Sequence, residues 1–114
     1  ERVREYVDLM LNFVKPGAML DYGCGIGIFL AAAREKGFHH NLGADVSQAA
    51  LEFAQSRIGE DDRLLDLTNE SVGDDKFDVI SFMDSDQCQA MIIWVKIDSF
   101  GEYSVIKFLY FFHC

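Results

Sequence analysis

The stretch MLDYGCGIG at residues 19–27 decides the fold of this chain. Apolar residues around its start predict a short buried strand over 18–22, and three alternating glycines predict a loop directly after it. An alanine-rich segment at 28–36 then predicts a helix that Gly37 ends. Glycine permits positive backbone φ angles, and it lets a ligand approach the backbone because no Cβ stands in the way. A glycine loop between a strand and a helix therefore marks a candidate binding site.

Segments of strand and helix character alternate along the rest of the chain. Short apolar segments predict strands at 42–46, 63–66 and 77–82. Helices are predicted from an apolar stripe within 1–15 and from residues 48–57, which Ser47 can cap. This alternation is typical of βαβ units. It predicts an α/β fold with an open, mainly parallel, Rossmann-like sheet and helices on both of its faces.

The spacing of the glycines separates two classes of nucleotide ligand. Dinucleotide-binding loops follow the pattern GxGxxG, and here the third glycine position falls on Ile28 or Leu30. The dinucleotide interpretation is weakened by this mismatch, although it stays open. Asp45 follows 18 residues after Gly27, at the end of the second predicted strand. A carboxylate there can accept hydrogen bonds from both hydroxyls of a ribose, so the pattern favours an adenosyl ligand.

Residues 1–85 resemble the class I S-adenosylmethionine-dependent methyltransferases. Four motifs carry the resemblance: MLDYGCGIG at 19–27, GADVS at 43–47, DL at 66–67 and KFDVISFMD at 76–84. It implies S-adenosyl-L-methionine as cofactor, with its methionine part on the glycine loop, its ribose on the second-strand acid and its adenine amino group near the third-strand acid. Methyl donor and acceptor would meet at the end of the fourth strand. The cofactor-binding residues implied in this way are Asp21, Gly23, Cys24, Gly25, Gly27, Asp45, Val46, Asp66, Leu67 and Met83.

The resemblance implies an enzyme that transfers a methyl group to an acceptor that the sequence does not identify, with this chain supplying the cofactor-binding half. The methyl donor is already activated, so such a protein mainly positions the acceptor and excludes water. No catalytic residue is assigned, and Cys24 is expected to be a small buried residue rather than a nucleophile. Two alternatives stay open: a non-catalytic fragment that binds the adenosyl cofactor, and a less favoured NAD-binding oxidoreductase domain.

The chain changes character near residue 85. We expect one incomplete domain over 1–114, with an N-terminal helix (1–15), a cofactor-binding core (18–85) and an atypical tail (86–114). The tail is rich in aromatic residues, and its strand-like segments at 92–97 and 104–112 belong either to a second edge of the sheet or to no part of the fold. We expect that the chain is truncated or altered after about residue 85, so that the C-terminal half of the fold is incomplete.

Composition limits the partners and the compartment. Nineteen acidic residues against ten basic ones give a net charge of −9, which disfavours nucleic acid as acceptor relative to a small molecule. Three cysteines without CxxC spacing predict no metal site and a reducing compartment. Apolar runs are too short to cross a membrane, so a cytoplasmic protein is expected. The oligomeric state cannot be read from the sequence.

Overall fold

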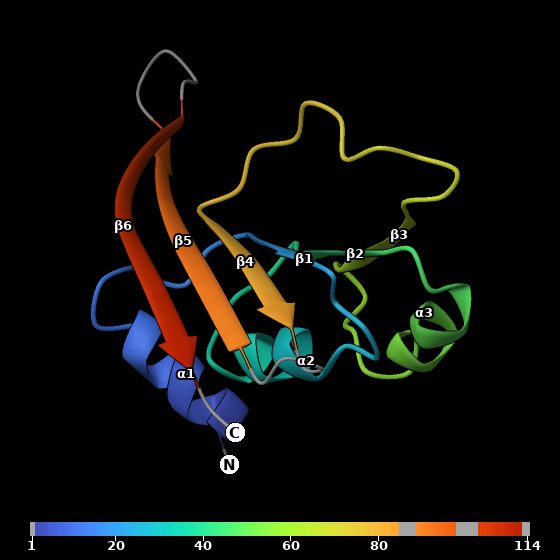
Figure 1. The fold of residues 1–114 in the computed structure, drawn as a ribbon, viewed down its shortest axis with the longest axis horizontal. Coiled ribbons are helices and arrows are strands. Elements are labelled where there is room, and N and C mark those ends of the chain that lie inside the picture. Colours follow the sequence, from blue (N-terminus) through green and yellow to red (C-terminus); the bar gives the residue numbers. More distant parts are fainter. Residues whose placement is uncertain (1, 85–88, 98–102, 113–114) are drawn as a thin grey trace.

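The structure is a computed structural model that describes residues 2–84, 89–97 and 103–112, with the side chains of residues 3–82. Its elements in chain order are α1 (Arg2–Met10), β1 (Met19–Tyr22), α2 (Ile28–Glu35), β2 (Leu42–Asp45), α3 (Gln48–Ala54), β3 (Arg63–Asp66), β4 (Val79–Asp84), β5 (Gln89–Ile97) and β6 (Tyr103–Phe112). The strands form one sheet in the order β3-β2-β1-β4-β5-β6 (Figure 1). β1 to β4 pair in parallel, and β5 and β6 add antiparallel. The mainly parallel, Rossmann-like α/β class is confirmed.

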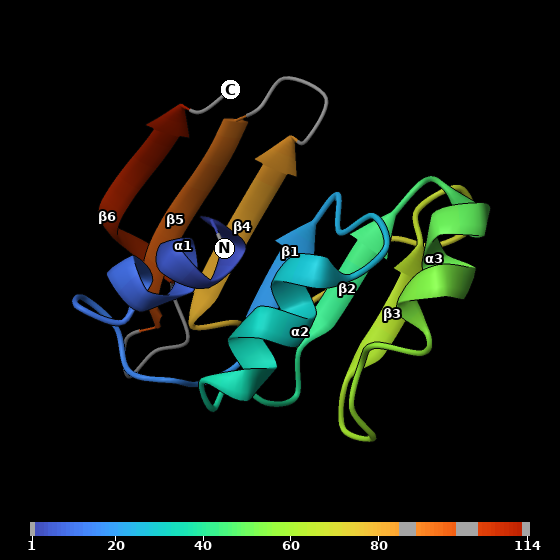
Figure 2. The same ribbon diagram turned by 90° about the horizontal axis from the view of Figure 1, so that it is seen from below.

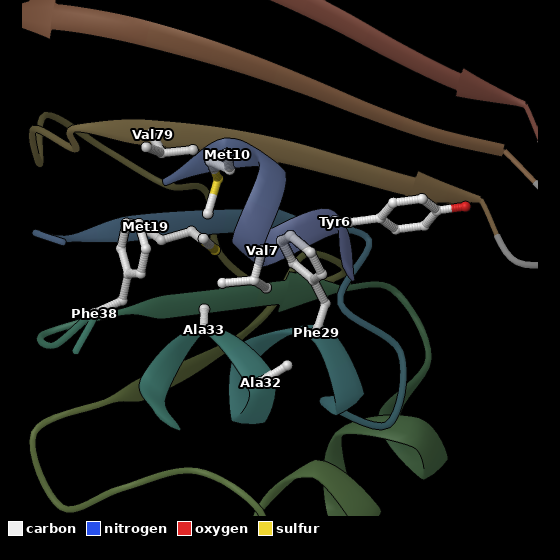
Figure 3. Packing of buried hydrophobic residues seen from close by; sticks show 9 residues of the cluster. All are labelled: Tyr6, Val7, Met10, Met19, Phe29, Ala32, Ala33, Phe38 and Val79. Carbon is white, nitrogen blue, oxygen red and sulfur yellow. The ribbon is translucent and has the colours of Figure 1, made fainter. Parts of the chain in front are cut away.

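All three helices of the described segments pack on one face of the sheet. α1 and α2 enclose a core with Met19 of β1 and Val79 of β4 (Figure 3). α3 packs on the same side, because its Leu51 contacts Leu30 of α2 and Cys24 of the glycine loop. The prediction of helices on both faces is therefore wrong for the part of the chain that the structure describes.

The opposite face is covered by the connection between β3 and β4. Leu20 and Leu42 point to that side and are buried together with Phe77 of the connection. Residues 67–78 contain three Asp, one Asn and one Gly, residue types that favour turns over a helix. The crossover from β3 to β4 is consequently made by an irregular segment instead of a helix.

Glycine in β2 lets α2 approach the sheet closely. A Cβ added at Gly43 would lie 2.5 Å from Cδ1 of Leu30 and 3.0 Å from Sγ of Cys24. Both neighbours are buried, so neither could move away freely. The close packing of α2 on the sheet therefore depends on the absence of a side chain at Gly43. The position of the first turn of α2, directly after the glycine loop, depends on it as well.

Several helix ends confirm local predictions, and others shift. The Ser47 hydroxyl accepts a hydrogen bond from Ala50 N at 3.2 Å and caps α3, and Gly37 takes φ 102° after α2. α1 ends at Met10, earlier than the predicted helix, because Phe13 N bonds to Met10 O only three residues back. The side chain of Phe13 is consequently 52% exposed and does not continue the buried stripe.

The tail forms a second edge of the sheet. β5 pairs antiparallel along the whole of β4, and β6 pairs along β5. Of the two alternatives that the sequence left for the tail, the structure has the first, and β4 is covered. Residues 85–88, 98–102 and 113–114 and the side chains of the tail lie outside the described part. The division of the chain into helix, core and tail stays a prediction.

Candidate functional site

The predicted binding residues gather at the carboxyl ends of the parallel strands. Figure 2 shows the arrowheads of β1, β2, β3 and β4 at one edge of the sheet. The glycine loop follows β1 there, and Asp45 and Asp66 close β2 and β3, where their Cα atoms are register partners. Ligands of open parallel sheets bind at this edge, so the sequence pattern and the topology point to one place.

The glycine loop has a backbone that only glycine adopts easily. Gly23, Gly25 and Gly27 take φ angles of 86°, 57° and 87°. The loop is attached to β2, because Gly23 N and Cys24 N both donate to Ala44 O, at 2.7 and 3.0 Å. These angles lie in the left-handed region that side chains with a Cβ avoid. The three glycines are therefore required by the path of the chain.

Two of these glycines differ in their surroundings. A Cβ added at Gly25 would meet nothing within 4 Å, whereas one at Gly27 would lie 3.1 Å from Cβ of Ala54 in α3. Gly27 thus permits close packing, and Gly25 leaves open space above the loop. Gly27 is also the N-cap of α2 and offers no side chain to its first N–H groups. Those donors remain directed toward the loop.

Asp45 connects the glycine loop to the start of α3. Its Oδ2 accepts a hydrogen bond from Gly25 N at 2.7 Å, and its Oδ1 accepts one from Ser47 N at 2.9 Å. A carboxylate has about four acceptor positions, so about two remain for a ligand. Val46, the next residue, is 65% exposed. A hydrogen-bond acceptor and an apolar side chain therefore lie next to Gly25.

Asp66 stabilises its own turn at the end of β3. Its Oδ1 accepts from Thr68 N at 2.9 Å and from the Thr68 hydroxyl at 2.6 Å. These bonds hold the pKa of Asp66 below its usual range, with the hydroxyl as the larger cause. Leu67 N donates to Asp45 O at 2.9 Å, which ties the ends of β2 and β3 together. Asp66 also lines an open groove of about 400 Å³ between α3 and β3.

Asp21 lies beneath the loop and is fully buried. Its Oδ1 accepts a hydrogen bond from the Ser81 hydroxyl at 2.9 Å, while its Oδ2 has no partner among the described atoms. Burial raises the pKa of Asp21 to about 7, against the opposing effect of the Ser81 bond, and the charge of Asp45 raises it further. Ser81 was missed by the sequence reasoning. A polar residue between the apolar residues Ile80 and Phe82 was the available signal.

Cys24 is buried in the loop, as expected. Burial, followed by the charges of Asp21 and Asp45, raises the pKa of its thiol to about 12. The thiol therefore stays protonated at neutral pH, and a protonated thiol is a poor nucleophile. Its Sγ fills space next to Gly43 instead.

Apolar side chains surround the open part of the loop. Tyr22 and Ile26 are 41% and 38% exposed on either side of the first two glycines. The Tyr22 ring lies 5.6 Å from the ring of Phe82 in β4, its register partner. Met83 follows in β4 beside this pair, but its side chain lies outside the described part. A ligand with an apolar portion would find partners at this edge.

Metal-binding clusters and membrane-spanning helices are both absent from the described residues. No group of three or more His, Cys, Asp and Glu side chains there could hold a metal ion. None of the described helices is long and apolar enough to cross a membrane.

Comparison with known proteins places these features in a family. A family model described as a methyltransferase domain matches residues 1–85. The ribosomal protein L11 methyltransferase of Lactobacillus gasseri is 39% identical to this chain in an alignment of length 75 that covers 59% of this chain and 22% of that protein. The chain thus spans about a fifth of the length of that curated relative.

Solved structures agree with this assignment. An S-adenosylmethionine-dependent methyltransferase from Mesorhizobium loti matches 69% of this chain and 39% of its own, with 27% identity and a TM-score of 0.54. The S-adenosylmethionine-bound amino pentose methyltransferase of calicheamicin biosynthesis from Micromonospora echinaspora matches 96% of this chain and 74% of its own, with 14% identity and a TM-score of 0.58. At that identity the second likeness concerns the fold alone. With 85 of its 114 residues matched by the family model, the chain belongs to the methyltransferase domain family, as its resemblance to the class I S-adenosylmethionine-dependent methyltransferases predicted.

Proposed function

We propose that this chain binds S-adenosyl-L-methionine at the carboxyl edge of its sheet and serves as the cofactor-binding half of a methyltransferase. The observation that carries the proposal is the hydrogen bond of 2.7 Å between Gly25 N and Oδ2 of Asp45. It brings the acid to Gly25, where an added Cβ would meet nothing within 4 Å. Loop and acid can therefore contact the same ligand, as an adenosyl group joined to an amino acid requires.

The residues present fit this cofactor. Space at Gly25, spare acceptor positions on Asp45 and the unpartnered Oδ2 of Asp21 are all compatible with a polar ligand at the loop. The exposed Val46 offers an apolar surface beside the acid. A buried acceptor without a partner costs stability, and exposed apolar side chains that gather in one place are typical of a binding site.

Each part of the site would have a distinct task. The backbone of 23–27 would hold the methionine part, Asp45 the ribose, and Val46, Asp66 and Leu67 the adenine. Met83 would line the site from β4. When bound, the cofactor supplies a methyl group on a positively charged sulfur, which needs no further activation. The chain's own residues bind and orient it and exclude water, which can lower a barrier by up to roughly 7–11 kcal/mol.

We further propose a small molecule as acceptor in preference to nucleic acid, because the net charge of −9 repels phosphate groups. The test is transfer of a labelled methyl group from the cofactor to small-molecule extracts, with ribosomal protein L11 and RNA as separate arms. Labelling of small molecules alone supports the proposal. Labelling of L11 or RNA overturns it, and binding without any labelling favours a non-catalytic cofactor-binding fragment.

Calorimetry with S-adenosylhomocysteine, the demethylated product, tests the cofactor assignment. We expect saturable binding to the 114-residue chain, and no displacement of the ligand by excess NAD. Displacement by NAD would support the dinucleotide alternative instead. The loop lacks the third glycine of the dinucleotide-binding pattern, which permits close packing of helix and strand. In this chain Gly43 of β2 permits the close packing of α2 instead.

Replacing Gly25 by Ala should affect binding more than folding. The backbone φ of +57° makes a side chain there strained, at a cost of about 1 kcal/mol in the free energy of unfolding. The added methyl group meets no protein atom but occupies the open space above the loop. We expect at least a tenfold loss of affinity for S-adenosylhomocysteine, about 1.4 kcal/mol.

Gly73→Ala is the matched control. Gly73 also has a positive φ, of 78°, and open surroundings, but it lies in the connection between β3 and β4. Both variants should lose similar stability in urea unfolding, and only Gly25→Ala should lose affinity. Equal affinities of the two variants would contradict a ligand above Gly25.

A further inference from the structure

Two buried polar side chains face each other beneath the glycine loop. Asp21 of β1 and Ser81 of β4 are register partners in adjacent parallel strands, and both are fully buried. The Ser81 hydroxyl donates to Oδ1 of Asp21 at 2.9 Å. The carbonyl of Leu20 is a second and longer acceptor for that hydroxyl, at 3.4 Å. The carboxyl is therefore held on one oxygen and unpartnered on the other.

The protonation of the Asp21 carboxyl depends on a small number of neighbouring groups. The titratable groups that act on it electrostatically are Asp45 at the end of β2 and the Cys24 thiol of the loop. The helices on the same face contribute mainly apolar side chains to the adjoining cores: Phe29 and Leu30 of α2, and Tyr6, Val7 and Met10 of α1. With no cation among these groups, the Ser81 hydroxyl is the described neighbour that favours the charged form.

We propose that Ser81 is a positioning residue of the cofactor site: its hydroxyl fixes the Asp21 carboxyl under the glycine loop and favours its ionised form, so that cofactor affinity follows the proton on Asp21. The proposal rests on the proposed function and deepens it. A negative charge two residues before the loop attracts the positive amino group that the cofactor and S-adenosylhomocysteine both carry. The unpartnered Oδ2 becomes, when ionised, an acceptor that only a bound donor can satisfy.

Because cofactor affinity depends on the ionised form of Asp21, the affinity of the natural chain should change with pH in one direction. Below neutral pH, Asp21 keeps its proton and affinity for S-adenosylhomocysteine is low. Affinity rises as Asp21 ionises and then levels off. Binding near neutral pH releases a fraction of a proton, because the ligand favours the ionised carboxyl.

Ser81→Ala removes the bond that favours ionisation. The midpoint of the pH profile should move up by about one unit, since a hydrogen bond to the charged form lowers a pKa by about that amount. Affinity near pH 7 should then fall about fivefold, while affinity at high pH should be nearly unchanged. Ser81→Thr keeps the hydroxyl and should restore the original profile. Ser71→Ala, which changes an exposed serine of the β3–β4 connection, is the matched control.

Two measurements decide the proposal. The first is calorimetry with S-adenosylhomocysteine from about pH 5.5 to 8.5, which spans the titration of a group near neutrality. The second is the pH titration of the Asp21 carboxyl carbon by NMR in the free chain, where Ser81→Ala should raise the midpoint and Ser81→Thr should not. Identical profiles of the natural chain and Ser81→Ala would overturn the proposal.

Other outcomes are equally decisive. If Ser81→Ala does not fold, calorimetry of the natural chain in two buffers with different ionisation enthalpies decides, and absence of proton release near pH 7 overturns the proposal. If the natural chain binds no S-adenosylhomocysteine at any pH, the proposed function fails. The NMR titration then still decides whether Ser81 controls the proton on Asp21.

Discussion

Asp45→Ala should abolish most of the affinity for S-adenosylhomocysteine. The substitution removes the acceptor that we assign to the ribose, and two charge-assisted hydrogen bonds of about 1.5 kcal/mol or more each correspond to at least a 100-fold loss. It also removes the acceptors for Gly25 N and Ser47 N, so the loop loses its hydrogen-bonded link to the start of α3. The free energy of unfolding should fall by about 1–3 kcal/mol. Calorimetry and urea unfolding measure the two effects.

Asp78→Ala separates the loss of affinity from the loss of stability. Asp78 also accepts a hydrogen bond from a backbone donor, Ala18 N at 2.8 Å, but at the amino ends of β1 and β4. The variant loses a comparable contact at the edge opposite the site. We expect reduced stability with unchanged affinity. If Asp45→Ala binds within about threefold of the natural chain, less than 1 kcal/mol, Asp45 does not hold the ligand.

Asp21→Asn should change how stability depends on pH. The pKa of Asp21 is about 7 in the folded chain, above its ordinary value of 3.8, so between these values the folded state binds more protons than the unfolded state. This group's contribution to stability is therefore fully present below about pH 4 and is lost as the pH rises to about 7. Three pKa units correspond to about 4 kcal/mol as an upper limit. Asn has no such proton.

The measurement is the difference in free energy of unfolding between the natural chain and Asp21→Asn across that pH range. Relative to the natural chain, the variant should gain up to about 4 kcal/mol between pH 4 and pH 8. The comparison cancels the titration of other acids, such as Asp66, whose lowered pKa gives the opposite slope. Asp74→Asn, at an exposed position of the β3–β4 connection, is the control for losing one carboxylate. A constant difference between the natural chain and Asp21→Asn would contradict the raised pKa of Asp21.

The sequence by itself determined the parts of this protein that depend on neighbouring residues. The strand, loop and helix around 19–27 were predicted because glycines at these positions leave the backbone few alternatives. The Ser47 cap of α3 was predicted because an N-cap acts within three residues. Asp45 was predicted at the sheet edge because parallel strands place their carboxyl ends together. Local geometry and the rule for parallel strands were sufficient for the cofactor loop.

Tertiary structure alone decided the features that depend on strand register. Asp21 and Ser81 are separated by 60 residues, and only the pairing of β1 with β4 brings their side chains together. The face on which the helices pack, and the pairing of β5 with β4, likewise follow from contacts between distant segments. A shift of one residue in register would turn Ser81 to the opposite face of the sheet. Residue types determine a local conformation. The burial and the protonation of Asp21 depend instead on which distant residue lies opposite it in the complete sheet.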